Sequence, residues 1–131
     1  MRRVVLDPGV LVSALITPTG PPAKLLERAR GGEFELVASP HLLAELERVL
    51  LRDKFRRYVA VEKVGTFLEA VRGEATVVPD PGEPPPMNSV DPKDDYLIAL
   101  AYTQKAILIS GDSDLLELSG GAPICRPRDL T

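Results

Sequence analysis

Short apolar runs alternate with longer stretches of helical periodicity along this chain, and that alternation limits the folds open to it. The runs predicted as strands are residues 3–6, 34–38, 75–78, 106–110 and 122–125. Residues 40–50 give the clearest helix, with an apolar stripe made of Leu42, Leu43, Leu46, Val49 and Leu50. Strands that alternate with helices favour a parallel sheet with helices packed on it. We predict one domain over residues 1–131, an α/β sandwich with a mainly parallel sheet of four or five strands.

Acidic residues stand where two of these strands end. Asp7 ends the first strand, and Asp112 and Asp114 follow the strand at 106–110. The carboxyl ends of parallel strands form the ligand crevice of open α/β sheets, and carboxylates that share a crevice repel unless a divalent cation neutralises them. Because a proline and a glycine follow Asp7, we expect it to bind a ligand and to have no helix-capping duty. Asp112 or Asp114 could instead cap the turn that follows.

The helix at 40–50 offers a further acid, and its geometry leaves a choice between two residues. At roughly 100° per residue, Glu45 and Glu47 lie about 40° beyond opposite edges of the apolar stripe. Either carboxylate could therefore face the crevice.

A second pair of adjacent acids, Asp94 and Asp95, precedes the predicted central helix at 96–104. The helix dipole stabilises carboxylates in the first turn of a helix, and this explains the presence of one of the two acids. Two adjacent acids therefore favour a role for one of them in a functional site. Asp91 stands directly before a proline and is interpreted as the N-cap of this helix.

The residue types restrict the metal that such a crevice could bind. The chain has one histidine and one cysteine, which excludes a zinc site built from nitrogen and sulfur ligands. An all-oxygen site suits Mg²⁺ or Mn²⁺. We expect His41, in the first turn of its helix, to be solvated, and Cys125 to be a buried structural thiol.

Charge and hydropathy narrow the class of protein further. The net charge of −3 argues against a simple basic surface for nucleic acid. Basic residues gather between Arg48 and Lys63, however, either as a solvated helix face or as a rim that contacts phosphates.

The apolar runs are far shorter than the ~20 residues of a membrane span, the first residues lack a signal-peptide core, and a lone cysteine excludes an internal disulfide. We therefore expect a cytoplasmic protein without a membrane segment.

In four segments the chain resembles the PIN-domain family, and in particular the small PIN proteins of the VapC type that serve as toxins of toxin–antitoxin pairs. The matching segments are Val4–Asp7 with Val10–Leu15, Ala38–Leu46, Asp91–Ala101 and Ile109–Leu116. The resemblance implies a three-layer α/β/α sandwich. It also selects Glu45 over Glu47 and implies a catalytic and metal-binding set consisting of Asp7, Glu45, Asp95 and Asp112, with Asp114 as an auxiliary metal ligand and Asp94 as a neighbour.

One position departs from the family pattern. The first aspartate of the family is usually followed by Thr or Ser and then by Asn or Ser, whereas Pro8 and Gly9 follow Asp7 here. Loss of groups that support a metal ligand can cost ~10–100-fold in metal affinity or activity. We expect weakened activity from this departure.

The resemblance implies a metal-dependent ribonuclease with one or two Mg²⁺ or Mn²⁺ ions that activate a water and neutralise phosphate charge. Single-stranded RNA or an exposed tRNA loop is the expected substrate, with 5′-phosphate ends on the products. Ser13 and Ser110 could contact phosphate or a ligand water, or serve the core or a turn. An antitoxin protein and a homodimer or higher homo-oligomer are the expected partners, with the helical segments at 11–16 or 61–71 as candidate contact surfaces.

Two other functions compete with this one. A phospho-acceptor module of the receiver kind is also α/β and binds Mg²⁺, but it needs a lysine after a late strand, and Arg126 and Pro127 follow the last strand here. A catalytically silent PIN fold that binds RNA or a protein is the second alternative, and the departure after Asp7 is its main support.

Overall fold

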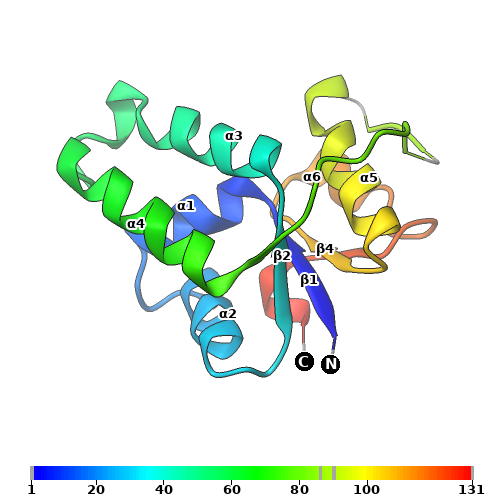
Figure 1. Ribbon diagram of the computed structural model, residues 1–131, viewed down its shortest axis with the longest axis horizontal. Coiled ribbons are helices and arrows are strands. Elements are labelled where there is room, and N and C mark those ends of the chain that lie inside the picture. The colour runs from blue at the N-terminus through cyan, green and yellow to red at the C-terminus, as the bar shows by residue number, and fades with distance from the viewer. Residues whose placement is uncertain (1, 86, 90, 131) are drawn as a thin grey trace.

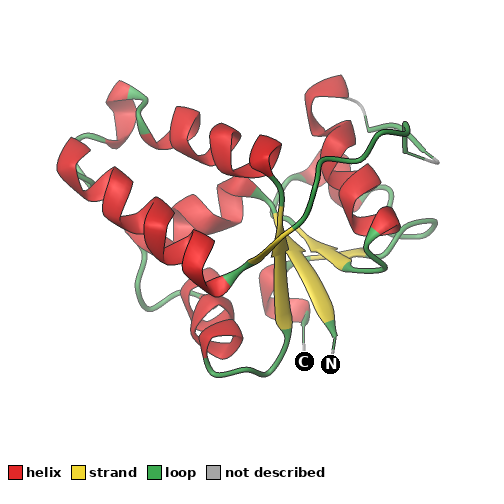
Figure 2. Ribbon diagram, in the orientation of Figure 1, coloured by secondary structure: helices red, strands yellow, loops and turns green. Residues whose placement is uncertain are grey.

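In the computed structural model, which describes residues 2–85, 87–89 and 91–130, parallel strands form one central sheet in the order β3-β2-β1-β4-β5. The strands are β1 (Arg3–Leu6), β2 (Glu35–Ala38), β3 (Thr76–Val77), β4 (Ile107–Ile109) and β5 (Ile124–Cys125). All pairings between neighbouring strands are parallel. Figure 2 shows these strands at the centre of the molecule with helices on both sides. The predicted α/β class and parallel sheet are confirmed.

Helices connect the strands and cover both faces of the sheet. They are α1 (Pro8–Ile16), α2 (Pro21–Arg30), α3 (Pro40–Leu50), α4 (Val61–Glu74), α5 (Asp95–Thr103) and α6 (Ser113–Leu116), with 3₁₀ turns η1 (Asp53–Phe55), η2 (Pro92–Asp94) and η3 (Pro127–Asp129). Figure 1 shows α1 to α4 on one side of the strands and α5 and α6 on the other. The arrangement is the predicted three-layer α/β/α fold.

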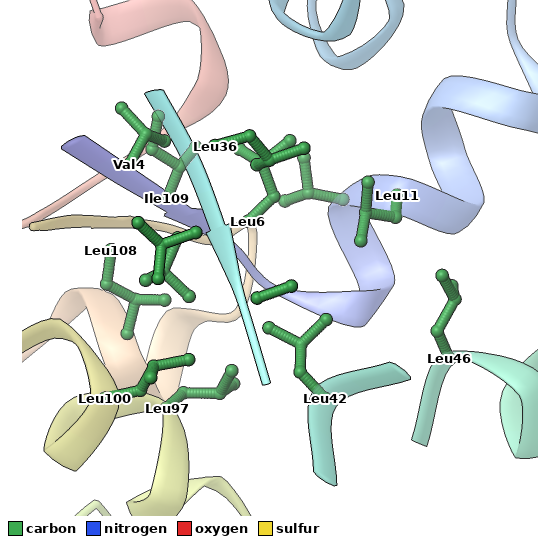
Figure 3. Packing of buried hydrophobic residues seen from close by; sticks show 14 of the residues in the cluster. Val4, Leu6, Leu11, Leu36, Leu42, Leu46, Leu97, Leu100, Leu108 and Ile109 are labelled. Atoms are coloured by element: carbon green, nitrogen blue, oxygen red, sulfur yellow. The ribbon is translucent and has the colours of Figure 1, made fainter. Parts of the chain in front are cut away.

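The core lies between the sheet and these helices. Leu6 of β1 and Leu108 of β4 are fully buried. Figure 3 shows Leu11 of α1 and Leu46 of α3 on one side of β1, and Leu97 of α5 on the other. Burial of a leucine side chain contributes roughly 1.5–3 kcal/mol, so the sheet is fixed from both faces. The strand ends that bear the acidic residues are therefore rigidly placed.

Two segments differ from what the sequence favours. Phe55 and Tyr58 lie at helical spacing after Asp53 and favour a helix there, but only the short turn η1 forms, and none of its residues is buried. The strands β3 and β5 are shorter than the apolar runs that predicted them, since each lies at an edge of the sheet and pairs on one side only. Among the described residues, none of the helices has the length and apolar character needed to cross a membrane.

Candidate active site at the carboxyl edge of the sheet

Asp7 and the loop after β4 lie side by side because β1 and β4 are neighbours in the sheet. Leu6 is in register with Ile109, and the Asp7 N–H donates to the Ile109 carbonyl oxygen at 3.0 Å. The residues that follow each strand therefore emerge at the same edge. The parallel pairing brings Asp7, Ser110 and Asp112 together, as the sequence predicted for the two acids.

The Asp7 carboxylate is held by hydrogen bonds to both of its oxygens. Oδ1 accepts from the Gly9 N–H at 2.8 Å, and Oδ2 accepts from the Ser110 hydroxyl at 2.7 Å. Asp7 is thus the N-cap of α1, and the expectation that it would have no capping duty is wrong. A proline at the first helical position is compatible with a cap, because that position needs no N–H donor.

Ser110 links two of the acidic residues. It is fully buried, donates from its hydroxyl to Asp7, and accepts from the Asp112 N–H at 3.0 Å. Burial raises the pKa of Asp7, and the nearby Asp112 charge raises it further, although the hydrogen bonds from Gly9 and Ser110 partly oppose this. A carboxylate destabilised in this way favours a cation beside it.

Asp112 and Asp114 have different placements. Asp112 is the N-cap of α6, where its Oδ1 accepts from the Asp114 N–H at 2.9 Å, and it lines two pockets together with Asp7. Asp114 is half-buried and does not line the described pockets that contain Asp7. Capping and exposure to the crevice are therefore combined in Asp112.

Glu45, and not Glu47, faces the crevice from α3. Glu45 is half-buried and lines a pocket with Asp7, whereas Glu47 is exposed to solvent. Arg48 lies one turn further along α3. It donates a hydrogen bond from Nε to Glu45 Oε1 at 2.9 Å and a second one from Nη2 to the same oxygen. The Arg48 guanidinium lowers the pKa of Glu45. Glu45 is thus neutralised by a cation from its own helix.

Of the adjacent pair before α5, Asp94 reaches the crevice and Asp95 does not. Asp95 is turned towards the preceding loop, where its Oδ1 accepts from the Ser89 N–H at 2.8 Å. Asp94 lines the pocket with Asp7, and its pKa is raised to about 6 by burial and then by the charges of Asp7 and Asp112, with Asp91 and Asp95 adding to the effect. The two side chains point in different directions because Asp94 is the last residue of η2. This 3₁₀ turn starts after the Asp91 cap and sets the direction of the residues that follow.

The crevice has a volume of about 340 Å³ and a mixed rim. Its acidic residues come from the strand ends, from η2 and from the middle of α3. Its basic residues are Arg48 of α3, Arg52 just after α3, and Lys93 of η2. The lining residues are Asp7, Pro8, Gly9, Glu45, Arg48, Val49, Arg52, Asp91, Lys93, Asp94, Tyr96 and Asp112. Acidic side chains could bind a metal ion, and the basic side chains beside them could bind a phosphate group that approaches this ion.

Tyr96 is the main residue of this site that the sequence analysis did not single out. Its hydroxyl oxygen is buried and has no hydrogen-bond partner among the described residues. Burial raises the pKa of the Tyr96 phenol, and the charges of Asp7, Glu45 and Asp94 raise it further. His41, expected to be solvated, instead stacks on the Tyr96 ring although it is exposed. Only the tertiary structure brings these two residues together.

Residues 3–114 match the family described as PIN domain. The chain belongs to the PIN domain family. The strands β1 to β4 and the acidic residues at the carboxyl edge of the sheet all lie within this matched range. The resemblance predicted from the sequence is therefore confirmed at the level of the family.

A related sequence and two solved structures support this assignment. The chain is 34% identical over 119 residues to "Uncharacterized protein MJ1680" of Methanocaldococcus jannaschii, over 88% of this chain and 74% of the relative. A chain in the crystal structure of VapBC2 from Rickettsia felis, bound to a DNA fragment from their promoter, superposes with a TM-score of 0.66 at 12% identity, covering 95% of this chain and 98% of that chain. The crystal structure of PAE2754 from Pyrobaculum aerophilum superposes with a TM-score of 0.59 at 17% identity. The superposition covers 95% of this chain and 83% of that chain. At such identities the two structures establish the fold alone.

The carboxylates of this PIN domain have the chemistry of a hard-cation site but are not drawn together as ligands. Among the residues that the structure describes, no group of three or more His, Cys, Asp or Glu side chains is close enough to hold a metal ion. The donors in the crevice are all oxygens, however, and burial, with a smaller contribution from neighbouring acids, raises the pKa of both Asp7 and Asp94 there. The donor set fits Mg²⁺ or Mn²⁺, provided that Glu45 exchanges Arg48 for the cation.

Proposed function

We propose that this PIN domain protein is a metal-dependent ribonuclease that cleaves single-stranded RNA or an exposed tRNA loop and leaves 5′-phosphate ends. The observation that carries the proposal is the placement of four carboxyl groups, those of Asp7, Glu45, Asp94 and Asp112, along one crevice. A folded protein tolerates such crowding where a cation offsets it.

Asp7, Glu45, Asp94 and Asp112 would hold Mg²⁺ or Mn²⁺ in this proposal. Asp94 takes the position that the sequence resemblance assigned to Asp95, because the Asp95 carboxylate accepts from the Ser89 N–H. Asp114 remains an auxiliary candidate. The chemistry supplied by such a site is activation of a water as nucleophile and neutralisation of phosphate charge.

The remaining residues of the crevice have binding and orienting roles. Ser110 and the Gly9 N–H fix the Asp7 carboxylate, so that it does not need to reorganise. Arg48, Arg52 and Lys93 line the same crevice and could bind the phosphates of a single strand. The Tyr96 hydroxyl has the free hydrogen-bonding capacity to position a water or a phosphate oxygen.

A catalytically silent RNA- or protein-binding PIN fold is the alternative, because Pro8 and Gly9 replace the usual hydroxyl and amide after the first aspartate. Two observations favour activity. The Gly9 N–H and the Ser110 hydroxyl already orient both oxygens of Asp7. A Cβ at Gly9 would contact Asp7 Oδ1 at 3.5 Å, an ordinary contact, so that a side chain is sterically allowed there. The departure would therefore weaken the site without disabling it.

We further propose that the protein is the toxin of a toxin–antitoxin pair, acts in the cytoplasm where its RNA lies, and assembles as a homodimer or higher oligomer. The solved VapBC2 neighbour is the basis for an antitoxin partner. Of the two helices considered from the sequence, α1 is largely buried, whereas α4 exposes Val61 (55%). The exposed Leu51 precedes α4 in the chain, which makes α4 the better candidate for a contact surface.

The test is cleavage of a labelled single-stranded RNA with Mg²⁺, with Mn²⁺ and with excess EDTA. We expect cleavage only with the metals and a loss of at least about 100-fold in Asp7→Asn and in Asp94→Asn. Glu47→Gln is the matched control, because Glu47 is a solvent-exposed acid on the same helix as Glu45, and it should cleave like the parent. Cleavage in EDTA, or full activity in both aspartate variants, would refute the proposal.

A further inference from the structure

We propose that the stacked side chains of His41 and Tyr96 form a binding subsite for one nucleobase of the RNA, next to the phosphate held at the acidic crevice. This inference rests on the proposed function and adds to it a residue-level account of how the strand is held.

The two rings form a flat aromatic stack between two different helices. Their centroids are 3.8 Å apart and the angle between their planes is 14°. His41 lies in the first turn of α3 and Tyr96 in the first turn of α5, the helix that follows Asp94. The stack therefore links the starts of α3 and α5 in the pocket that adjoins the crevice.

Hydrogen bonds at the start of α3 hold the histidine in place. The backbone N–H of His41 donates to Asp80 Oδ1 at 3.0 Å. The backbone N–H of Leu42 donates to the Oγ of the buried Ser39 at 3.3 Å. Tyr96 precedes Leu97, which is buried in the core. Both rings are thus fixed before a ligand arrives, which reduces the entropy lost when a base stacks on them.

The pocket beside the stack combines flat apolar walls with cations. Its volume is about 430 Å³, and its lining consists of His41, Glu45, Arg48, Pro92, Lys93 and Tyr96. Binding pockets for small organic groups have about 300–1,000 Å³ and mostly apolar or aromatic walls with a few polar groups. Aromatic faces for a base and basic side chains for its phosphate are the combination by which proteins bind single strands.

The pocket and the acidic crevice are adjacent. Glu45, Arg48, Lys93 and Tyr96 line both of them. A strand whose phosphate lies between Asp7 and Asp94 would therefore place a neighbouring base at the rings. A second pocket on the other side of Asp7, of about 370 Å³ and lined by Ser13, Pro22 and Pro127 among others, provides room for the strand to continue.

A stacking subsite predicts a dependence on the base that a purely electrostatic groove does not. Loss of one stacked aromatic side chain typically weakens binding about 5- to 150-fold for each base. Because all bases have a flat π face, the subsite would accept any of them and would distinguish only a strand without bases. His41 is exposed, so its replacement should not unfold the protein.

His41 is the only histidine of the chain, so its ring protons give isolated NMR signals that report on this subsite alone. The experiment titrates the Asp7→Asn protein, with Mg²⁺ present, with a short oligoadenylate and with an abasic ribose-phosphate oligomer of equal length. We expect upfield ring-current shifts of the His41 signals with oligoadenylate and none with the abasic oligomer. Equal shifts with both oligomers, or none with either, would overturn the subsite. Saturation by adenosine monophosphate at the same concentration as the oligomer would assign the pocket to free nucleotides and would also overturn it.

A binding assay with variants separates stacking from a structural role of the pair. His41→Ala should weaken oligoadenylate binding about 5- to 150-fold and leave binding of the abasic oligomer at the parent level, and His41→Phe should restore most of the loss. Tyr58→Ala, at an exposed tyrosine outside the pocket, is the matched control and should bind like the parent. A His41→Ala loss of equal size for both oligomers would contradict stacking.

The outcomes also separate this inference from the proposed function. Metal-dependent cleavage by the wild-type protein without base-dependent His41 shifts would leave the nuclease standing and remove the subsite. Base-dependent shifts in a protein that cleaves no RNA with Mg²⁺ or Mn²⁺ would do the reverse. In an active protein, His41→Ala should raise KM more than it lowers kcat, because the His41 ring binds the strand and does not line the crevice where the reacting phosphate lies.

Discussion

The two walls of the crevice hold their carboxylates in opposite ways. On the sheet side, Asp7 and Asp112 are fixed by backbone N–H groups and by the buried Ser110 hydroxyl. On the side of α3, Glu45 is held by Arg48, its one hydrogen-bonding side-chain partner within the described part of the chain, and the Arg48 side chain is half-exposed. The pKa of Asp7 is raised whereas that of Glu45 is lowered. The sheet wall is therefore rigid and has excess negative charge, while the α3 wall is adjustable and already neutralised.

This difference indicates how the site would respond to a cation. The sheet wall offers preorganised ligands whose charge is unfavourable until a cation arrives. The α3 wall offers a ligand that must first leave Arg48. An exposed pair of this kind contributes little to stability, so the exchange is inexpensive. Arg48, once released, would be free to bind the phosphate of the substrate.

The largest expected effect on the comparison comes from replacing Ser110, whose hydroxyl hydrogen-bonds to both acids of the sheet wall. Ser110→Ala removes the hydroxyl that fixes Asp7 Oδ2 and leaves the Asp112 N–H without its acceptor. We expect metal affinity or activity to fall about 10–100-fold and the free energy of unfolding to fall by roughly 1–3 kcal/mol. Calorimetric metal titration and urea unfolding measure the two effects. Ser119→Ala is the control, since Ser119 is exposed and does not line the described pockets around Asp7, and equal behaviour of the two variants would show that Ser110 does not support Asp7.

A smaller effect concerns pH and the excess charge near Asp94. Its pKa is raised from 3.8 to about 6, so the folded protein binds more protons than the unfolded chain between these values. Stability should therefore fall as pH rises from about 4 to 6 and stay reduced above 6. After allowance for solvent screening, the loss due to Asp94 is about 1 kcal/mol. Urea unfolding across this range should show a flatter profile for Asp94→Asn, and an identical profile would contradict the raised pKa.

The smallest effect is expected on the adjustable wall. Arg48→Gln frees the Glu45 carboxylate, and we expect metal affinity to rise by less than about fivefold while RNA binding weakens. Arg72→Gln is a matched control, because Arg72 pairs with Glu69 at the same i,i+3 spacing on α4, away from the crevice. Calorimetric titration with Mg²⁺ decides the first effect and fluorescence anisotropy with RNA the second. A decrease in metal affinity in Arg48→Gln would mean that Arg48 orients Glu45 for the metal.

Features set by strand order and periodicity could be predicted from the sequence. The parallel sheet follows from the alternation of strands and helices, and the placement of Asp7 beside Asp112 follows from the strand ends. The helical pattern limited the α3 acid to Glu45 or Glu47, and the family resemblance chose Glu45, which is the one that lies in the crevice.

Features set by local turns and tertiary contacts could not be predicted. The sequence pattern left Asp94 and Asp95 open, and the family resemblance selected Asp95, the acid directly before the apolar run of α5. Whether Asp94 or Asp95 faces inward depends on the 3₁₀ turn η2, whose phase differs from that of an α-helix. The stacking of His41 on Tyr96 depends on how α3 and α5 approach each other across the sheet, which no local pattern encodes.

The claim that Asp94 completes one metal site with Asp7, Glu45 and Asp112 is tested most directly by melting curves with EDTA and with Mn²⁺. The parent, Asp94→Asn and Asp95→Asn should be compared. A site that is lost on unfolding stabilises the fold by about 2.7 kcal/mol when free metal is a hundredfold above Kd. We expect the Mn²⁺-dependent rise in Tm in the parent and in Asp95→Asn, whose amide oxygen can still accept from the Ser89 N–H, and its loss in Asp94→Asn. Equal Mn²⁺ shifts in all three proteins, or a loss only in Asp95→Asn, would contradict the account.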